Sequence, residues 1–359
     1  MTLIESITNI SYRGISYTNV IKEVLMTNLN FPLFITWNIT SNCNLRCKHC
    51  YQENHVPVQL PYEDLLKTLN QYRKLLKETG CKGHINLTGG EPLFCPHLFK
   101  LLDEFKKDKD LYSFAILTNG TLLTDEMAKK IASYNPWFVQ VSLEGGKKTN
   151  DYVRGKGTYE KIGNAIKLLR KYDIWVSVSF TATKLNYKEL PTVVDYVTEM
   201  GGSAVWSDRY IPLGDQRDSD FIMTQKETQE WLDIMFSKRK QQYNEGKKTI
   251  VSMMRALQFT RSNEEPYECT AGWGLLTVME NGDIVPCRRM PIVVGNIHED
   301  EMIDLYKNHP VLQDLKKSSI PKGCLKCNHA NKCRGGLRCL TYALTGDYKL
   351  KDPGCNLGE

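Results

Sequence analysis

The chain has 359 residues, 25% of them charged, and a formal net charge of +6. This length suits one large α/β domain and a smaller one, and no apolar run is long enough to span a membrane. The positive charge lies in mixed-charge stretches without an RNA-binding motif, so we expect no nucleic-acid partner. Residues 1–30 lack the apolar block of a signal peptide, so we expect a cytoplasmic protein.

Strand-like and helix-like segments alternate from about residue 31 to residue 214. Six strand–helix units in series predict a parallel sheet covered by helices, and a closed barrel of eight units would need more chain. We therefore predict an α/β fold: a partial (β/α)6 TIM-like barrel over 32–245, after an N-terminal extension over 1–31. The remaining residues, 246–359, are predicted to form a small cysteine-rich domain with a β-hairpin and short helices. The predicted strands are 34–40, 84–87, 113–117, 138–143, 175–181 and 204–211, and the predicted helices are 61–79, 97–107, 124–132, 159–172 and 226–243.

Local signals mark the ends of several elements. The apolar residues of the helix over 61–79 form one stripe, and Gly80 is expected to end it. Thr124 is expected to cap its helix, and Asn186 and Glu189 are expected to form a capping box on another. The dipeptide at 281–282, Asn-Gly, predicts a β-hairpin, which would bring the cysteines on either side of it together.

Twelve cysteines, many at short spacings, indicate metal binding in a reducing compartment rather than disulfides. The first group is Cys43, Cys47 and Cys50. A structural zinc site and a fully protein-held iron–sulfur cluster each take four ligands. Three thiolates on a [4Fe–4S] cluster would therefore leave one iron open to another ligand. A partial zinc knuckle, or three incidental thiols, is the plainer alternative.

This spacing, followed by Tyr51, resembles the cluster loop of the radical S-adenosylmethionine (SAM) superfamily. The resemblance implies that SAM chelates the open iron of the cluster. Reduction of the cluster would then cleave SAM to a 5′-deoxyadenosyl radical, which abstracts hydrogen from an unactivated C–H bond. A flavodoxin or ferredoxin is implied as the electron donor.

Further motifs at successive strand ends, where barrel enzymes place their chemistry, strengthen the resemblance. A Gly-Gly-Glu motif resembles the element that binds the SAM amine, since glycines let the backbone approach a ligand closely. A Ser-x-acid-Gly motif resembles the element at the SAM ribose or carboxylate, and an Arg-Gly motif resembles one whose guanidinium can pair with that carboxylate. Each motif alone can be a turn or a surface ion pair. The residues implied to contact SAM are His49 and Tyr51, through their backbone, with Thr88, Gly89, Gly90, Glu91, Asn119, Ser142 and Arg154.

The seven C-terminal cysteines resemble those of the SPASM domain, which holds two auxiliary iron–sulfur clusters in peptide maturases. A zinc ribbon with one four-cysteine site would explain only part of this set. There is one departure: five residues instead of three precede the sixth cysteine, Cys339, and Leu337 stands at the usual position. Either Cys339 still reaches its cluster, or that cluster is incomplete or [2Fe–2S]. The resemblance assigns Cys269, Cys287 and Cys339 to the first auxiliary cluster and Cys324, Cys327, Cys333 and Cys355 to the second.

The resemblance names a chemistry and leaves the substrate open. Our first hypothesis is a maturase that crosslinks, epimerises or oxidises a ribosomally made peptide or gives it a thioether bond. Because only about thirty residues precede the barrel, a leader peptide would bind a separate protein or the SPASM surface. Our second hypothesis is conversion or decarboxylation of a tetrapyrrole side chain, as in haem or haem d1 precursors. A non-catalytic iron–sulfur protein is a third.

Arg288 and Arg289 follow Cys287 and could clamp a substrate carboxylate, although a surface strand end is an equally simple interpretation. Sulfatase maturases carry an Asp where Arg288 stands, so that activity is disfavoured. The candidates for a general base are the strand-end residues Glu144, Asp208 and Tyr210.

Overall fold

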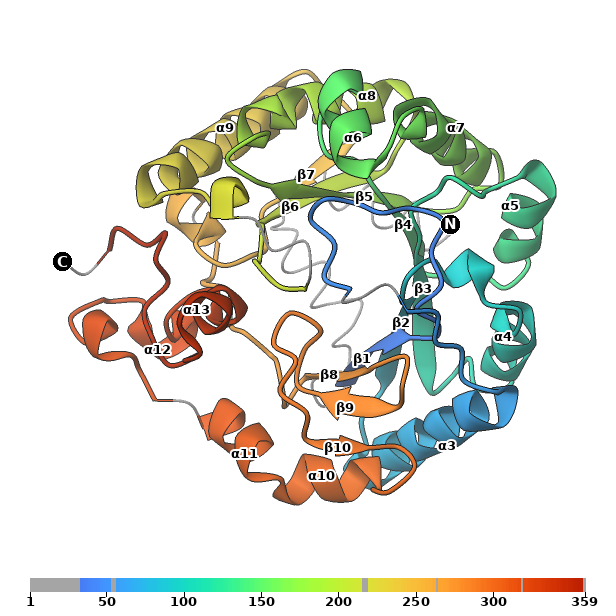
Figure 1. Ribbon diagram of the computed structural model, residues 1–359. Coiled ribbons are helices and arrows are strands. Elements are labelled where there is room, and N and C mark those ends of the chain that lie inside the picture. The colour runs from blue at the N-terminus through green and yellow to red at the C-terminus, as the bar shows by residue number, and fades with distance from the viewer. Residues whose placement is uncertain (1–32, 53–55, 215–218, 263, 318, 358–359) are drawn as a thin grey trace.

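A computed structural model describes residues 33–52, 56–214, 219–262, 264–317 and 319–357. One sheet of ten strands, in the order β10-β9-β8-β1-β2-β3-β4-β5-β6-β7, curves into a barrel with helices around its outside (Figure 1). Neighbouring strands from β8 to β7 are parallel, whereas β9 and β10 add antiparallel pairs. The strands are β1 Leu33–Asn38, β2 Gly83–Thr88, β3 Tyr112–Leu117, β4 Phe138–Ser142, β5 Val176–Ala182, β6 Ala204–Arg209, β7 Ile250–Ser252, β8 Leu275–Val278, β9 Asp283–Val285 and β10 Gly295–Asn296.

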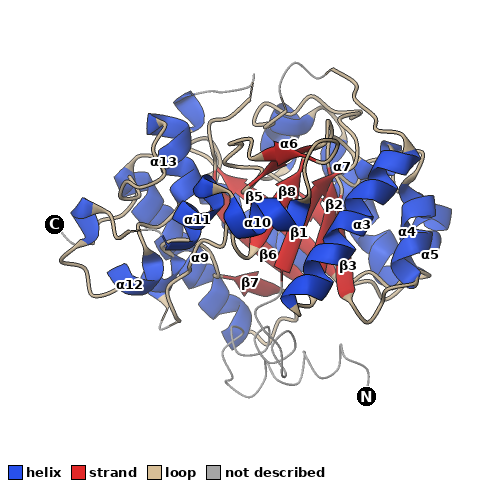
Figure 2. Cartoon of the chain, turned by 90° about the horizontal axis from the view of Figure 1, so that it is seen from below, coloured by secondary structure: helices blue, strands red, loops and turns tan. Residues whose placement is uncertain are grey.

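The helices of the barrel form a ring, and a second group of helices lies beside β8–β10 (Figures 1 and 2). None of the helices in the described ranges is long and apolar enough to cross a membrane. The ring helices are α3 Tyr62–Thr79, α4 Leu98–Lys106, α5 Asp125–Ala132, α6 Lys147–Arg154, α7 Thr158–Lys171, α8 Leu190–Glu199 and α9 Gln225–Asn244. The second group is α10 Met302–Asn308, α11 Pro310–Lys317, α12 Ala330–Cys333 and α13 Arg338–Thr345.

The predicted partial barrel is confirmed, and its sheet is wider than the six predicted strands. β7 and β8 add one parallel strand at each edge, and in the described part of the chain β7 and β10 are the two edges, so the sheet stays open. β7 has only three residues, too few for a periodic signal. The same sheet therefore continues past residue 245, and the domain division at that point remains a prediction.

Three predictions made from short stretches of sequence are confirmed. The predicted stripe on α3 is fully buried, and Gly80 ends the helix with φ +66°. The Thr124 hydroxyl accepts a hydrogen bond from the Met127 amide, as a cap should. The Asn281-Gly282 turn connects β8 to β9, which pair antiparallel.

The capping box predicted from Asn186 and Glu189 is wrong. The Asn186 side chain accepts from the Thr183 amide and donates to the Glu144 carbonyl oxygen. The Glu189 carboxylate instead accepts from the Gly146 amide at 2.8 Å. Both side chains thus tie loops at the top of the barrel together, and α8 begins one residue after Glu189. Asn186 and Glu189 therefore hydrogen-bond to residues in other loops and do not cap the helix as their spacing predicted.

Candidate functional site

The three N-terminal cysteines lie in the loop that leaves β1 at its carboxyl end. The loop is held to α6, since the Lys48 amide donates to the Val153 carbonyl oxygen at 2.9 Å. The two ends of the loop are also held together: the Gln52 side-chain amide donates to the carbonyl oxygen of Ser41, which belongs to the stem of the loop, residues 39–42, at 2.6 Å. Cys43, Cys47 and Cys50 all line one large cavity inside the barrel.

N–H groups point at the sulfur atoms of this loop. The Leu45 amide donates to Cys43 Sγ and the Gln52 amide donates to Cys50 Sγ, each at 3.4 Å. The Asn119 side chain, after β3, donates to Cys43 Sγ at 3.9 Å. Hydrogen bonds to sulfur stabilise thiolates and tune cluster potentials. The residues present therefore fit an iron–sulfur cluster held by three thiolates.

Cys47 lies beside a buried guanidinium group. Arg154 Nη1, in the last turn of α6, lies 3.9 Å from Cys47 Sγ. Burial raises the pKa of the Cys47 thiol to about 11, although the Arg154 guanidinium lowers it. Formation of the thiolate therefore requires a positive partner, and binding of a metal centre would release the proton.

Gly89 and Gly90 bring the loop after β2 against the stem of the cysteine loop. Gly89 has φ +138°, and a Cβ there would lie 2.1 Å from the Thr40 carbonyl oxygen. The Gly90 amide donates to that same oxygen at 2.7 Å. Both glycines also line the cavity. Because both residues are glycines, the loop after β2 can pack against the backbone of Thr40, beside the cavity in which a ligand would bind.

Glu91 is held by hydrogen bonds to the segment that follows β3. Its carboxylate is buried and accepts from the Thr118 hydroxyl at 2.6 Å and the Asn119 amide at 2.7 Å. It does not line the cavity in the described part of the chain. Burial raises the pKa of Glu91, while these hydrogen bonds lower it. Glu91 therefore positions Asn119, and its contact with SAM stays a prediction.

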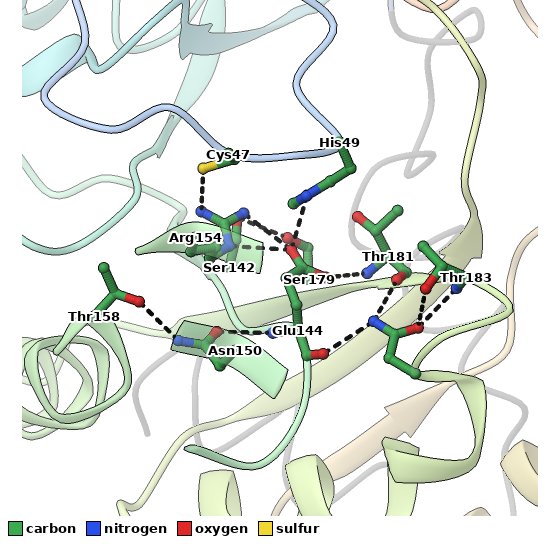
Figure 3. A network of polar contacts seen from close by, with 11 residues as sticks. Cys47, His49, Ser142, Glu144, Asn150, Arg154, Thr158, Ser179, Thr181 and Thr183 are labelled. Carbon is green, nitrogen blue, oxygen red and sulfur yellow. Dashed lines mark hydrogen bonds and ion pairs between the residues drawn. The ribbon is translucent and has the colours of Figure 1, made fainter. Parts of the chain in front are cut away.

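A buried ion-pair network lies beneath the cysteine loop (Figure 3). Arg154 Nε and Nη2 donate to Glu144 Oε1 at 3.2 and 3.0 Å, and His49 Nε2 lies 3.2 Å from the same oxygen. Burial raises the pKa of Glu144, but the His49 and Arg154 side chains outweigh this and lower the pKa to about 2. Glu144 is thus a permanent carboxylate that orients two cavity-lining side chains, which argues against a role as general base.

Two polar groups remain directed at the cavity near this network. His49 Nδ1 is buried without a partner among the described residues. Ser142, at the end of β4, hydrogen-bonds Ser179 through its hydroxyl at 3.0 Å and lines the cavity with it. An unpaired buried nitrogen is costly unless a ligand satisfies it. Both groups therefore fit a polar cofactor such as SAM at this end of the barrel.

The C-terminal cysteines form two separate groups. Cys269, Cys287 and Cys339 line the same large cavity as the first cysteine loop. Burial raises the pKa of the Cys339 thiol most strongly, and Cys287 and Cys269 are close enough to raise it further. The structure thus places Cys339 with the other two in spite of its unusual spacing. The remaining four thiols, of Cys324, Cys327, Cys333 and Cys355, line a second, much smaller cavity.

The thiols of each C-terminal group line a cavity, and they do not converge on one point that a single metal ion could occupy. Within the described ranges, no three His, Cys, Asp or Glu side chains converge closely enough to hold one metal ion. Thiolates around a polynuclear cluster lie further apart than those around one zinc ion, because the irons and sulfides separate them. The four-thiol set has the ligand number of a fully protein-held iron–sulfur cluster, and the three-thiol set has one ligand fewer.

The large cavity measures about 1160 Å³ and connects the first cysteine loop with the Cys269 group. Sites for small ligands usually measure roughly 300–1,000 Å³. The cavity is therefore larger than a usual site for one small ligand, and SAM would share it with the clusters that its six cysteines would hold.

The two arginines proposed from the sequence to hold a carboxylate have partners within the chain. Arg289 Nη1 lies 2.5 Å from Asp208 Oδ2. Arg288 donates to the Gly89 carbonyl oxygen at 3.0 Å and to the Thr88 hydroxyl at 3.3 Å. Both line the cavity, as does Asp208. Tyr210, another candidate base, is buried against Phe221 and does not line the described cavity.

A third arginine, which the sequence did not single out, is better placed for a substrate. Arg255 lines the cavity and lies 4.7 Å from the centroid of the Trp206 ring. No described residue forms an ion pair with it. Arg255 is close enough to the first auxiliary group to lower the pKa values of Cys269 and Cys287. It follows the short strand β7, and recognition of that strand would have marked it as a strand-end residue.

Comparisons with known proteins agree with this architecture. Residues 37–197 match the model of the radical SAM superfamily, and residues 269–328 match the SPASM iron–sulfur cluster-binding domain. The chain is 28% identical to the AdoMet-dependent heme synthase of Methanosarcina barkeri, covering 92% of this chain and 98% of that protein.

The chain is also 26% identical to the antilisterial bacteriocin subtilosin biosynthesis protein AlbA of Bacillus subtilis, over 85% of this chain and 67% of that one. The solved structure of native anSMEcpe with bound AdoMet shares the fold, with a TM-score of 0.76 and 21% identity over 90% of this chain and 94% of that one. The two domains indicate SAM and iron–sulfur clusters as cofactors. The chain is therefore an enzyme of the radical SAM superfamily with a C-terminal SPASM domain.

Proposed function

We propose that this enzyme oxidises a tetrapyrrole by removing hydrogen from a carboxylate-bearing side chain. The observation that carries the proposal is Arg255, a guanidinium on the cavity wall with no acidic partner in the described residues. Carboxylates are the preferred partners of guanidinium groups, which bind them with two parallel hydrogen bonds. Stacking on Trp206 would keep the Arg255 plane oriented while leaving its N–H groups available.

The size and lining of the cavity support a substrate with a flat, bulky ring. Its volume of about 1160 Å³ exceeds the usual range for one small-molecule site. Trp206, beside Arg255, contributes to its wall. Phe34, Trp137, Phe138 and Trp175 line the part of the cavity at the amino ends of the strands. The relative named as a heme synthase supports the same choice, because the match extends over nearly the whole of both chains.

The cofactors, when bound, would supply a 5′-deoxyadenosyl radical that takes one hydrogen atom from a substrate carbon. Loss of carbon dioxide from a propionate side chain would then leave a vinyl group and release one electron. Cys269, Cys287 and Cys339 line the same cavity, so an electron acceptor held by them would be next to the substrate. The chain itself binds the carboxylate through Arg255 and orients Arg154 and His49 through Glu144.

The test uses anaerobically reconstituted enzyme with SAM, a reductant and iron-loaded coproporphyrin III. We expect products that have lost one or two carboxyl groups as carbon dioxide, measured by mass spectrometry. Arg255→Gln should raise KM by about 10- to 100-fold, because it removes charge-assisted hydrogen bonds worth roughly 1.5–3 kcal/mol. Arg255→Lys should restore part of the affinity.

A matched control is Arg261→Gln, which removes an arginine whose Nε pairs with Asp233 at 2.6 Å outside the cavity lining. It should leave KM unchanged. An unchanged KM for Arg255→Gln would refute the carboxylate anchor. Absence of porphyrin turnover, together with formation of 5′-deoxyadenosine, would refute the tetrapyrrole.

A peptide substrate is the second candidate, and the relative named as a subtilosin biosynthesis protein favours it. In that case a co-expressed precursor peptide should gain or lose one or two hydrogens in mass. A separate leader-binding protein would then be a partner. Under either candidate we propose a cytoplasmic enzyme, since all twelve cysteines are free, as expected in a reducing compartment.

A further inference from the structure

Exposed basic side chains surround the loop that carries the first three cysteines. Arg46 and Lys48 flank Cys47 in the chain, and both are exposed. Lys48 Nζ lies 4.7 Å from the centroid of the Tyr152 ring on α6. Tyr152 is itself 56% exposed. The cysteine loop and α6 thus present one continuous surface.

Helix α6 extends this surface with further positive charge. Lys148 and Tyr152 are four residues apart and share one side of the helix. Lys156 follows the helix directly and is also exposed. We call Arg46, Lys48, Lys148, Tyr152 and Lys156 the cationic face.

The acidic groups nearby are already used within the chain. Glu160 pairs with Lys147. Asp151 accepts from the Gly157 amide at 2.7 Å and the Tyr159 amide at 2.9 Å. Among the described residues, no ion pair forms with Lys48, Lys148 or Lys156. The face therefore presents four positive side chains against one half-buried carboxylate, that of Asp151, and its net charge is positive.

The helix that carries part of the cationic face is in direct contact with the cysteine loop. Arg154, in the last turn of α6, contacts Cys47 Sγ, and the Lys48 amide donates to the Val153 carbonyl oxygen. A cluster on this loop works only after one electron reaches it from outside. The loop and α6 would be the protein layer between that cluster and solvent.

We propose that the cationic face docks a small acidic one-electron carrier protein that reduces the cluster held by Cys43, Cys47 and Cys50. One electron leaves the carrier and enters the cluster, and no bond forms or breaks. Opposite charges would steer the carrier to this face and speed association at low ionic strength. The exposed Tyr152 ring would supply the apolar centre that such interfaces place within a polar rim. The proposal does not depend on which substrate the enzyme uses.

The test reverses the charge at two positions of the face that lie outside the cysteine loop and do not line the cavity, Lys148→Glu with Lys156→Glu. The reconstituted enzyme is reduced either by a flavodoxin hydroquinone or by dithionite, and 5′-deoxyadenosine formation is followed. We expect the flavodoxin-driven rate to fall about tenfold or more at low salt, as steering is lost. The dithionite-driven rate should stay unchanged, because a small reductant needs no docking face. Calorimetric titration with flavodoxin should show the same loss of affinity.

A matched control reverses two lysines that lie over aromatic rings, in the last turns of α4 and α5. Lys106 lies 4.1 Å from the Tyr134 ring centroid and Lys130 lies 3.8 Å from that of Phe99. Lys106→Glu with Lys130→Glu makes the same change in net charge and should keep the flavodoxin-driven rate. For the wild type, that rate should fall with salt, since the Debye length shrinks from about 10 Å at 0.1 M to about 3 Å at 1 M.

Equal flavodoxin binding and equal flavodoxin-driven rates in the wild type and the cationic-face variant would overturn the proposal. Weaker binding of the substrate with unchanged reduction would also overturn it, because the face would then serve the substrate. If the variant loses its cluster, the calorimetric affinity for flavodoxin still decides, since docking is measured without turnover. Failure of the tetrapyrrole assay leaves this test unaffected.

Discussion

Cys43, Cys47 and Cys50 lie within one loop after β1, whereas Cys269, Cys287 and Cys339 come from three segments. In the first region, the loop's own amides donate to two of the sulfurs. In the second, the cysteines meet only because the β8–β9 hairpin joins the barrel sheet and α13 packs beside it. A short motif thus builds the first site, and long-range packing builds the second.

The two regions also use their buried ion pairs differently. Glu144 and Arg154 are ten residues apart in the chain and support the cysteine loop from below. Arg209, at the end of β6, and Asp352 are 143 residues apart, and Arg209 donates two hydrogen bonds to Asp352 at 2.6 and 2.5 Å. Asp352 also accepts from the Leu337 amide, two residues before Cys339. Both regions are therefore positioned by the barrel, but the ion pair beneath the N-terminal loop joins residues close in the chain and the C-terminal ion pair joins residues far apart.

The largest expected effect comes from removing the local site altogether. The triple variant Cys43→Ala, Cys47→Ala, Cys50→Ala should form no 5′-deoxyadenosine and should lose about four of about twelve irons. Iron and sulfide analysis after anaerobic reconstitution measures this. Replacing Cys81 and Cys95, which belong to none of the three cysteine groups, should change neither the iron content nor the formation of 5′-deoxyadenosine. Product formation by the triple variant would refute the assignment of the loop.

A smaller effect is expected from the long-range site. Cys339→Ala should lower the iron content by at most about four per chain and still form 5′-deoxyadenosine, because the first loop does not depend on it. Substrate conversion should fall if the first auxiliary group accepts the electron. A second change, Leu337→Cys in the same variant, would restore a thiol at the position where SPASM sequences usually have one. Unchanged iron content in Cys339→Ala would show that this thiol holds no cluster.

The smallest expected effect is on how the free energy of unfolding depends on pH, and it comes from the buried Glu144 network beneath the cysteine loop. The network lowers the pKa of Glu144 from its ordinary value of 4.5 to about 2. A carboxyl group with a lowered folded-state pKa stabilises the fold above its unfolded-state pKa and loses this contribution as pH falls toward the folded-state value. The free energy of unfolding should therefore decrease from about pH 5 toward pH 2.

Urea unfolding of the cluster-free protein across that range measures the decrease. Glu144→Gln should flatten the pH dependence and destabilise the protein at pH 7, because Arg154 is left buried without its partner. Glu160→Gln, which breaks only the exposed pair with Lys147, should leave the curve almost unchanged. Parallel curves for the wild type and Glu144→Gln would contradict the role given to this carboxylate.

Several residues show why the local predictions held. The α3 stripe that includes Leu65 and Leu69 is fully buried, because helical periodicity alone decides which face of a helix can be buried. Thr124 and Gly80 mark helix ends through hydrogen bonds and backbone conformations that span a few residues. The three thiols of the cysteine loop are close together for the same reason, since their spacing needs no other part of the chain.

Other residues show what only the tertiary structure decided. Arg288 and Arg289 were proposed from their position after Cys287, yet the structure gives them acceptors at Gly89 and Asp208. Asn186 and Glu189 bond across loops instead of capping a helix. Arg255 lines the cavity because three-residue β7 joins the edge of the sheet. These outcomes depend on which polar groups meet across distant segments, and no local pattern records that.

The sequence by itself thus determined the parallel α/β barrel and the three-thiol loop, which follow from periodicity and from short spacing within the chain. The division of the C-terminal cysteines into two sets came from the resemblance to the SPASM domain. Only the tertiary structure decided that both the first loop and the Cys269 group open on one cavity, and that Glu91 and Glu144 support that cavity from behind. The physical reason is that a polar side chain is satisfied by its nearest partner in space, which the fold selects from the whole chain.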